Sequence, residues 1–192
     1  DIPEAGRTAK GTAIVNLLYI SGDDKITAVI PVKSFDENQY LLTVTKNGIV
    51  KKTALTEYNT SRRDGIIALN MDEEDELIGV KLTEGQDELI MATHHGMVIR
   101  ISEQDIRPMG RVARGVKGIS LGAGDRVVAV ENITAGEELL CITEKGFGKR
   151  TKLKEFRSQG RGGKGLIGIR CTNKNGMVAG VVAISAGDEI MI

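Results

Sequence analysis

Short runs of aliphatic and β-branched residues recur along this chain at intervals of about fifty residues. Runs of this kind that lie between polar turns predict buried β-strands. Three of them begin three similar units: Leu41–Thr45, Leu89–Thr93 and Leu139–Thr143. In each unit a turn that ends in glycine leads to a second run, which is the pattern of a β-hairpin. The turn glycines are spaced 48 and 50 residues apart, at Gly48, Gly96 and Gly146.

Each unit continues with a short polar segment, a loop rich in glycine and arginine, and two further strand patterns. The short segments, 54–58 and 152–156, are long enough for only one helical turn. The third strand pattern is seen in Gly65–Met71, Val116–Leu121 and Leu166–Cys171, and the fourth in Leu77–Leu82, Val127–Val130 and Val178–Ile184. Four strands in about fifty residues predict an all-β, propeller-like array of four-stranded blades.

The repeats divide the chain into units at 1–39, 40–88, 89–138 and 139–189, with the start of a further blade at 190–192. We therefore expect one domain of about four repeats. The first unit begins at Gly6–Gly11, which matches Gly110–Gly115, but no hairpin pattern precedes it. The last residues, 188–192, match 87–91, where another hairpin starts. Because a repeat array needs capped or closed ends, we expect the sequence to be a piece of a longer protein.

Charge is sorted within every unit, although 26 basic and 26 acidic residues cancel over the whole chain. Residues 40–71 hold five Lys/Arg and two Asp/Glu, whereas residues 72–88 hold one and eight. The next unit changes sign in the same way: residues 89–121 hold five Lys/Arg and two Asp/Glu, whereas residues 122–138 hold one Lys/Arg and four Asp/Glu. Residues 139–171 then hold nine and two. Stacked units would therefore present one basic and one acidic surface.

No catalytic or metal-binding set can be assembled from the residue types in this chain. Residues 160–165 satisfy the letters of the dinucleotide pattern GxGxxG, but neither a βαβ unit nor a long helix surrounds them. The two cysteines lack metal-site spacing, and the only histidines, His94 and His95, lie in a predicted polar turn. No apolar run is long enough to span a membrane. We expect no catalytic residue, no metal and no cofactor in this piece, and a cytoplasmic location.

The basic loops are the remaining candidate for a function. They contain Ser61–Gly65, Gly110–Gly115 and Gln159–Gly165, and each combines glycine with Arg or Lys. Glycine allows backbone N–H groups to approach a phosphate, and the cations supply charge and hydrogen-bond donors. Several such loops at equal spacing predict a curved cationic track for bent double-stranded DNA, bound without sequence specificity.

These features resemble the C-terminal DNA-wrapping domain of bacterial DNA gyrase A. The family's hallmark is a box of the form Gln-[Lys/Arg]-Arg-Gly-Gly-[Lys/Arg]-Gly in its first blade, with degenerate copies in later blades. The segment Gln159-Gly160-Arg161-Gly162-Gly163-Lys164-Gly165 is similar to such a copy and departs from it at Gly160. Residues 6–18, 75–80, 115–119 and 144–151 are also similar to that domain and stand in the family's order.

The resemblance implies a β-pinwheel, a propeller-like disc whose blades exchange strands and whose basic rim wraps DNA during negative supercoiling. It implies that this piece starts within the second blade, so that the first blade with the intact box would be missing. The cleavage tyrosine and the ATPase, with ATP and Mg²⁺, would act elsewhere in the holoenzyme. The expected partners are double-stranded DNA, the rest of gyrase A, and gyrase B, in the bacterial cytoplasm at the nucleoid.

By position in the repeats, twelve cations are the predicted DNA contacts: Lys51, Lys52, Arg62, Arg63, Arg100, Arg107, Arg111, Arg114, Lys149, Arg150, Arg161 and Lys164. Two alternatives remain open at this point. One is the related C-terminal domain of topoisomerase IV, which shares the fold and has a more degenerate box. The other is a propeller that serves as a protein-binding scaffold through its acidic face.

Overall fold

A computed structural model describes residues 3–18, 26–62, 65–133 and 136–190 of the protein. Its regular elements are β-strands and single turns of 3-10 helix, so the predicted all-β fold is confirmed. The helical turns after the three hairpins lie where short segments were expected. They are η2 (Leu55–Tyr58), η3 (Glu103–Asp105) and η5 (Leu153–Glu155), and η1 (Ile14–Asn16) lies near the amino terminus. No helix in the described ranges is long and apolar enough to cross a membrane.

The three predicted hairpins form as expected, each closed by a Thr-x-x-Gly turn. They are β1 (Tyr40–Thr45) with β2 (Ile49–Ala54), β4 (Glu88–Thr93) with β5 (Met97–Ser102), and β8 (Glu138–Thr143) with β9 (Gly148–Lys152). In the first turn the Gly48 N–H donates to Thr45 O, and the Thr45 hydroxyl accepts from the Ile49 N–H. The turn glycines have φ between 75° and 86°, a conformation that disfavours side chains.

A third strand of each unit pairs antiparallel with the first strand of its hairpin. These strands are β3 (Leu77–Thr83), β7 (Val127–Asn132) and β12 (Val178–Ile184), and they lie where the fourth strand pattern was found. In all three pairs the register shifts near the hairpin turn, which indicates a β-bulge. The strand order then runs from β3 to β1 to β2, and likewise in the other two sheets.

The remaining strands are short and belong to the sheet of the preceding unit. Strand β6 (Val116–Lys117) pairs with β2, and β11 (Leu166–Ile167) pairs with β5. Strand β10 (Ser158–Gln159) also pairs with β5, in parallel. The exchange of strands between blades is therefore confirmed. The predicted strands 116–121 and 166–171 are wrong in length, because Gly118 and Gly168 leave the ladder and donate their N–H groups to Gly48 O and Gly96 O.

The described residues form three sheets, of four, five and three strands. Residues 65–71 form no strand, contrary to the prediction, and neither do residues 3–18 and 26–38 of the first unit. A donated strand needs the hairpin of the preceding unit as its acceptor, so residues 65–71 would need a hairpin in the first unit. Residues 26–38 lie where an inner strand would pair with that same hairpin, and the first unit contains no hairpin pattern.

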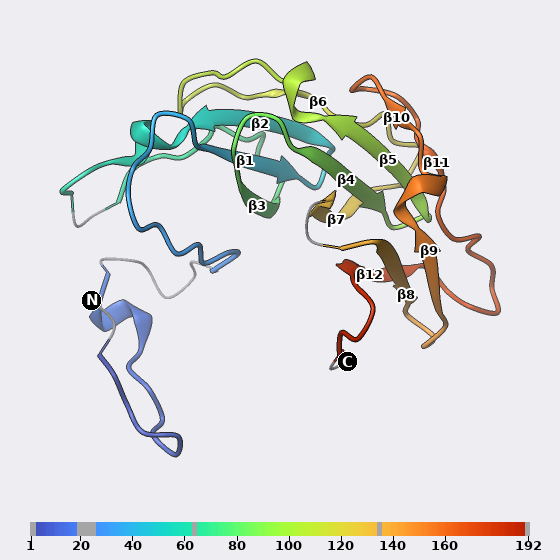
Figure 1. The fold of residues 1–192 in the computed structure, drawn as a ribbon, viewed down its shortest axis with the longest axis horizontal. Coiled ribbons are helices and arrows are strands. Elements are labelled where there is room, and N and C mark those ends of the chain that lie inside the picture. Colours follow the sequence, from blue (N-terminus) through green and yellow to red (C-terminus); the bar gives the residue numbers. More distant parts are fainter. Residues whose placement is uncertain (1–2, 19–25, 63–64, 134–135, 191–192) are drawn as a thin grey trace.

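The three sheets follow one another along an arc, with β3, β7 and β12 on its inner side (Figure 1). Strand β7 contacts both β3 and β12. The middle hairpin packs on both faces, which explains its continuous apolar run. Leu89 and Met91 belong to a buried cluster shared with the first hairpin, whereas Ile90 and Ala92 belong to a cluster shared with the third. Each fully buried large aliphatic side chain contributes about 1.5–3 kcal/mol.

A buried ion pair joins the second and third units. Lys52 Nζ on β2 lies 3.0 Å from Glu103 Oε1 on η3, and their side chains are 5% and 0% exposed. The Glu103 carboxylate also accepts from the Thr83 hydroxyl at 2.6 Å and from two backbone N–H groups, those of Gly85 and Asp87. Both charges are therefore compensated, as the burial of ions requires. Leucine occupies the position of Glu103 in the units on either side.

The hairpin glycines allow a direct test of strand donation. A Cβ atom on Gly96 would lie 2.1 Å from Ile169 O, whereas one on Gly146 would meet nothing within 4 Å. Both residues have positive φ, 86° and 75°. We expect G146A to cost about 1–2 kcal/mol from backbone strain alone. G96A should cost more than about 3 kcal/mol because the donated strand must move as well. Urea unfolding of both variants measures the difference, and equal costs would contradict this account.

The ion pair gives a second test. E103L removes the only carboxylate partner of Lys52 among the described residues and should destabilise the fold by about 3–5 kcal/mol. K52M/E103L should recover most of that loss, because an apolar pair can replace a buried ion pair. The matched control is E138L, which breaks the Arg150–Glu138 pair, where Arg150 is 65% exposed. It should cost less than about 1 kcal/mol. Chemical denaturation measures all three, and an E103L variant as stable as the wild type would contradict the role of Glu103.

Candidate nucleic-acid interface

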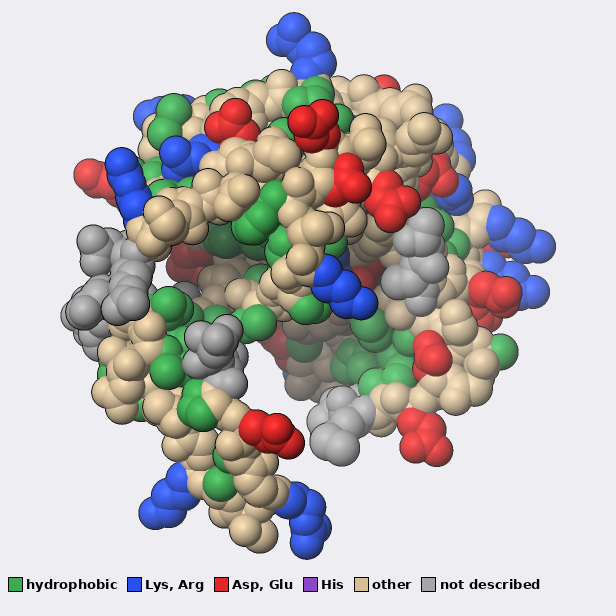
Figure 2. All heavy atoms as spheres, turned by 60° about the vertical axis from the view of Figure 1, so that its left-hand side comes forward, with side chains coloured by type: hydrophobic (Ala, Val, Ile, Leu, Met, Phe, Trp, Pro, Cys, Tyr) green, Lys and Arg blue, Asp and Glu red, His purple; other side chains and the backbone are tan. Residues whose placement is uncertain are grey.

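The basic loops lie along the outer edge of the arc. After the second and third hairpins the chain makes one 3-10 turn and then runs along the outer strand of the preceding sheet before it donates its own short strand. These connecting segments are residues 106–115 and 156–165, and residues 59–62 and 65–71 are their counterparts in the sequence repeat. In Figure 2 several Lys and Arg side chains project from the outline of the molecule.

Of the twelve predicted contacts, seven are exposed: Arg62, Arg107, Arg114, Lys149, Arg150, Arg161 and Lys164. Arg100 and Arg111 are half-buried, Lys51 and Lys52 are buried, and Arg63 lies outside the described residues. Some of the exposed cations already have protein partners. Arg114 forms an ion pair with Asp72 at 2.9 Å, and Arg161 Nε donates to Asp105 O at 3.1 Å. The exposed cations are thus spread over all three outer loops and β9.

The prediction of direct contact needs correction for Lys51 and Lys52, because the following unit covers both side chains. Lys51 is 1% exposed and Lys52 4% exposed. Arg100, at the same repeat position as Lys52, also binds within the protein. It pairs with Glu88 and donates to the carbonyls of Leu153 and Phe156 in the next unit. The hydrogen bond from Arg100 lowers the pKa of Glu88. These cations hold adjacent units together.

The segment Gln159–Gly165 also forms a joint between units. The Gly162 N–H donates to Gly118 O at 2.7 Å, so this amide is not available to a phosphate. Gly163 O accepts from the Ser120 N–H at 2.8 Å. Gly165 has a φ of 77°, and a Cβ there would lie 2.5 Å from Val98 O. The glycines therefore let the loop lie against the preceding blade, while Arg161 and Lys164 remain exposed.

Three further exposed cations lie on or next to these segments and were not among the predicted contacts: Lys117 on β6, Lys154 on η5 and Arg157. The spacing of the repeat indicates one of them. Arg157 stands 50 residues after Arg107, so both occupy the same position in successive loops. Neither has an ion-pair partner among the described residues. They form an equivalent pair of free cations on the outer edge.

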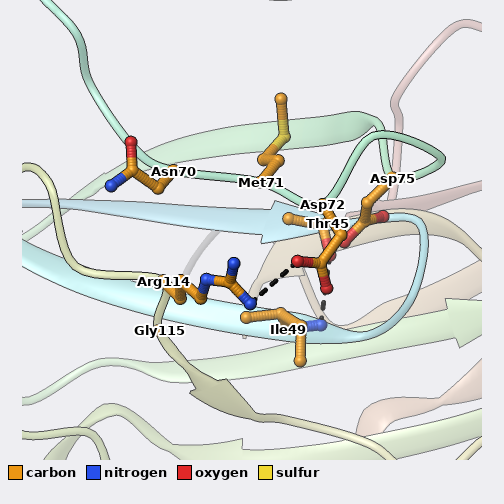
Figure 3. Close-up of a pocket in the computed structure, with 8 residues that line it drawn as sticks. All are labelled: Thr45, Ile49, Asn70, Met71, Asp72, Asp75, Arg114 and Gly115. Carbon is orange, nitrogen blue, oxygen red and sulfur yellow. Dashed lines mark hydrogen bonds and ion pairs between the residues drawn. The ribbon is translucent and has the colours of Figure 1, made fainter.

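A pocket between the second and third units has the wrong properties for a substrate site (Figure 3). Its volume is about 250 Å³, below the roughly 300–1,000 Å³ of typical ligand sites. Asp72 is paired with Arg114, and Asp75 accepts from the backbone N–H groups of Asn47 and Glu76. The described residues also contain no cluster of three potential metal ligands. This pocket therefore gives no support for a substrate or metal site between these two units.

Comparison with known proteins agrees with this fold and its repeats. The chain matches the family described as DNA gyrase C-terminal domain, β-propeller, over residues 1–33, 39–84, 87–134 and 137–185. The DNA gyrase A proteins of Salmonella typhimurium and Escherichia coli are each 44% identical to it over 191 residues, which is 100% of this chain and 22% of the relative. That of Clostridium acetobutylicum is 51% identical over 117 residues, 61% of this chain and 14% of the relative.

Solved structures show the same architecture. The C-terminal domain of DNA topoisomerase IV has a TM-score of 0.83 at 35% identity. The match covers 90% of this chain and 54% of the topoisomerase IV chain. A DNA gyrase A C-terminal domain has a TM-score of 0.81 at 24% identity, over 92% and 59% of the two chains. The β-pinwheel resemblance is thus confirmed, and the chain spans about a fifth of the full-length relatives that it matches over its whole length. The chain belongs to the DNA gyrase C-terminal domain family.

Proposed function

We propose that this chain is the part of a DNA gyrase A protein that binds and wraps double-stranded DNA. The observation that carries the proposal is the set of exposed cations on the outer loops of three successive units, arranged along an arc. A curved series of cations suits the phosphates of a bent duplex, and it reads the DNA backbone rather than the bases. Binding without sequence specificity follows.

The same proposal assigns the chemistry to other parts of the parent enzyme. The chain itself would bind DNA without cleaving it and without a cofactor, and its wrap would bias strand passage toward negative supercoiling. Its partners would be the rest of gyrase A, and gyrase B, in the bacterial cytoplasm at the nucleoid. Gyrase is favoured over topoisomerase IV because the relatives that match the whole chain at 42–44% identity are DNA gyrase A proteins. The topoisomerase IV domain of similar fold is 35% identical.

A gel-shift titration of the chain with linear duplex at several salt concentrations tests the proposal. If about six to ten cations meet phosphates, the affinity should fall by about 10³-fold or more between about 50 and 200 mM salt. The fall should be the same for duplexes of unrelated sequence, because phosphates carry the contacts. No binding at low salt, or an affinity that does not change across the series, would refute DNA wrapping.

The equivalent cations Arg107 and Arg157 test which surface is used. R107A/R157A should weaken binding to all duplex sequences and reduce the slope of log affinity against log salt by about 2, roughly 0.9 per lost contact. The matched control is K174A. Lys174 is also exposed but lies in the turn between β11 and β12, away from the outer loops. If K174A changes the slope as much as the double variant does, the outer edge is not the interface.

A further inference from the structure

Lys51 lies buried between the outer loops of two successive units. Its ammonium group donates to Ala68 O of its own unit at 2.6 Å and to Arg111 O of the next unit. Asn70 Nδ2 also crosses this boundary and donates to Val112 O at 2.7 Å. The side chain of Lys51 therefore fixes the position of one basic loop relative to the next.

A second cation, Arg111, lies next to Lys51. Arg111 is half-buried, and its guanidinium donates to Ile67 O at 2.8 Å. Its Nε is buried and has no hydrogen-bond partner among the described residues. No carboxylate of those residues pairs with Lys51 or Arg111, and the neighbouring ion pair, Arg114–Asp72, is exposed on both sides (Figure 3). Among the described residues, two like charges thus stand together without a counter-charge, unlike the Lys52–Glu103 pair.

This arrangement changes the pKa of Lys51. Burial, together with the charge of Arg111, lowers the pKa of Lys51 to about 8. The other titratable group that faces it is Tyr58 of η2, whose hydroxyl donates to the same Ala68 O at 3.4 Å and whose pKa is raised by burial. Arg63 and Asp64 of the adjoining loop lie outside the described residues. The protonated form of Lys51 is therefore less favoured than that of a solvent-exposed lysine, although it still predominates below about pH 8.

We infer that Arg111 and Lys51 form a seat for a DNA phosphate, in which Arg111 makes the contact and Lys51 is the positioning residue behind it. The inference rests on the proposed function and adds a linkage to it. A phosphate at Arg111 supplies the missing negative charge and favours protonated Lys51. DNA binding above about pH 8 then takes up one proton from solvent onto Lys51 Nζ.

The test compares the pH dependence of DNA affinity in the wild type and K51M, measured by fluorescence anisotropy with a short duplex from about pH 7 to about pH 9.5. Wild-type affinity should fall above about pH 8, by up to tenfold for each unit by which the phosphate raises the pKa of Lys51. K51M should bind more weakly at pH 7 and show no such fall. The amino-terminal group titrates in the same pH range in both proteins, so its effect on affinity cancels when the two profiles are compared. Profiles of the same shape in both proteins would overturn the inference.

The control is K149M, which removes the lysine at the same repeat position in the last unit. Lys149 Nζ donates to Gly168 O, the counterpart of Ala68 O, but the Lys149 side chain is exposed to solvent, unlike that of Lys51. K149M should lower affinity at every pH and keep the wild-type fall above pH 8. Calorimetry of the wild type at about pH 8.5, in buffers of different ionisation enthalpy, measures the proton uptake without any variant. An uptake of zero would also overturn the inference.

Thermal unfolding without DNA tests the titration of Lys51 separately from binding. Its folded pKa is below the unfolded value, so the unfolded chain binds more protons between about pH 8 and pH 10.5. Wild-type stability should therefore rise through that range relative to K51M. A chain that fails to bind DNA at pH 7 refutes the proposed function, whereas a missing rise refutes only the role of Lys51.

Discussion

Each complete blade of this protein depends on a strand donated by the following unit, and the donation depends on the hairpin turn. Gly118 and Gly168 donate their N–H groups to the carbonyls of Gly48 and Gly96, which brings the donor backbone against the turn. A side chain on Gly48 would collide with Ile119, and one on Gly96 with the backbone of Ile169. The repeated glycine is therefore a requirement of the contact between units, as well as of the turn itself.

The donation of strands between units also determines which cations are exposed and which are buried. Because a donated strand must reach the outer side of the preceding sheet, the segment before it has to run along the outer edge. Cations on that segment, such as Arg107 and Arg157, project into solvent. Cations on the strand beneath it, such as Lys51 and Lys52, become covered and bind protein groups instead. Strand exchange thus converts a sequence in which charges sum to zero into an outer edge of exposed cations above a layer of buried ones.

The three hairpins and their inner strands could be predicted from the sequence because they depend on local patterns of apolar residues and glycine. The partner of each donated strand could not, because a period of about fifty residues does not say whether Val116 pairs within its own unit or with the one before. The repeat does indicate that Lys51 and Glu103 are buried. Ile99 occupies the position of Lys51, and Leu55 and Leu153 occupy that of Glu103. The signal is partial, because Lys149 also shares its position with Ile99 and is nevertheless exposed where no following unit covers it among the described residues.

The two buried lysines of β2 show how similar positions can have opposite electrostatic consequences. Lys52 meets a carboxylate that is itself saturated with hydrogen bonds, so the pair is neutral and belongs to the folded scaffold. Lys51 meets two carbonyls and a second cation, so its positive charge remains uncompensated by the described residues. A protein that keeps such a charge beside its outer loops gives up stability there. That cost is offset when a polyanion lies along the loops, because the missing counter-charge then comes from the ligand.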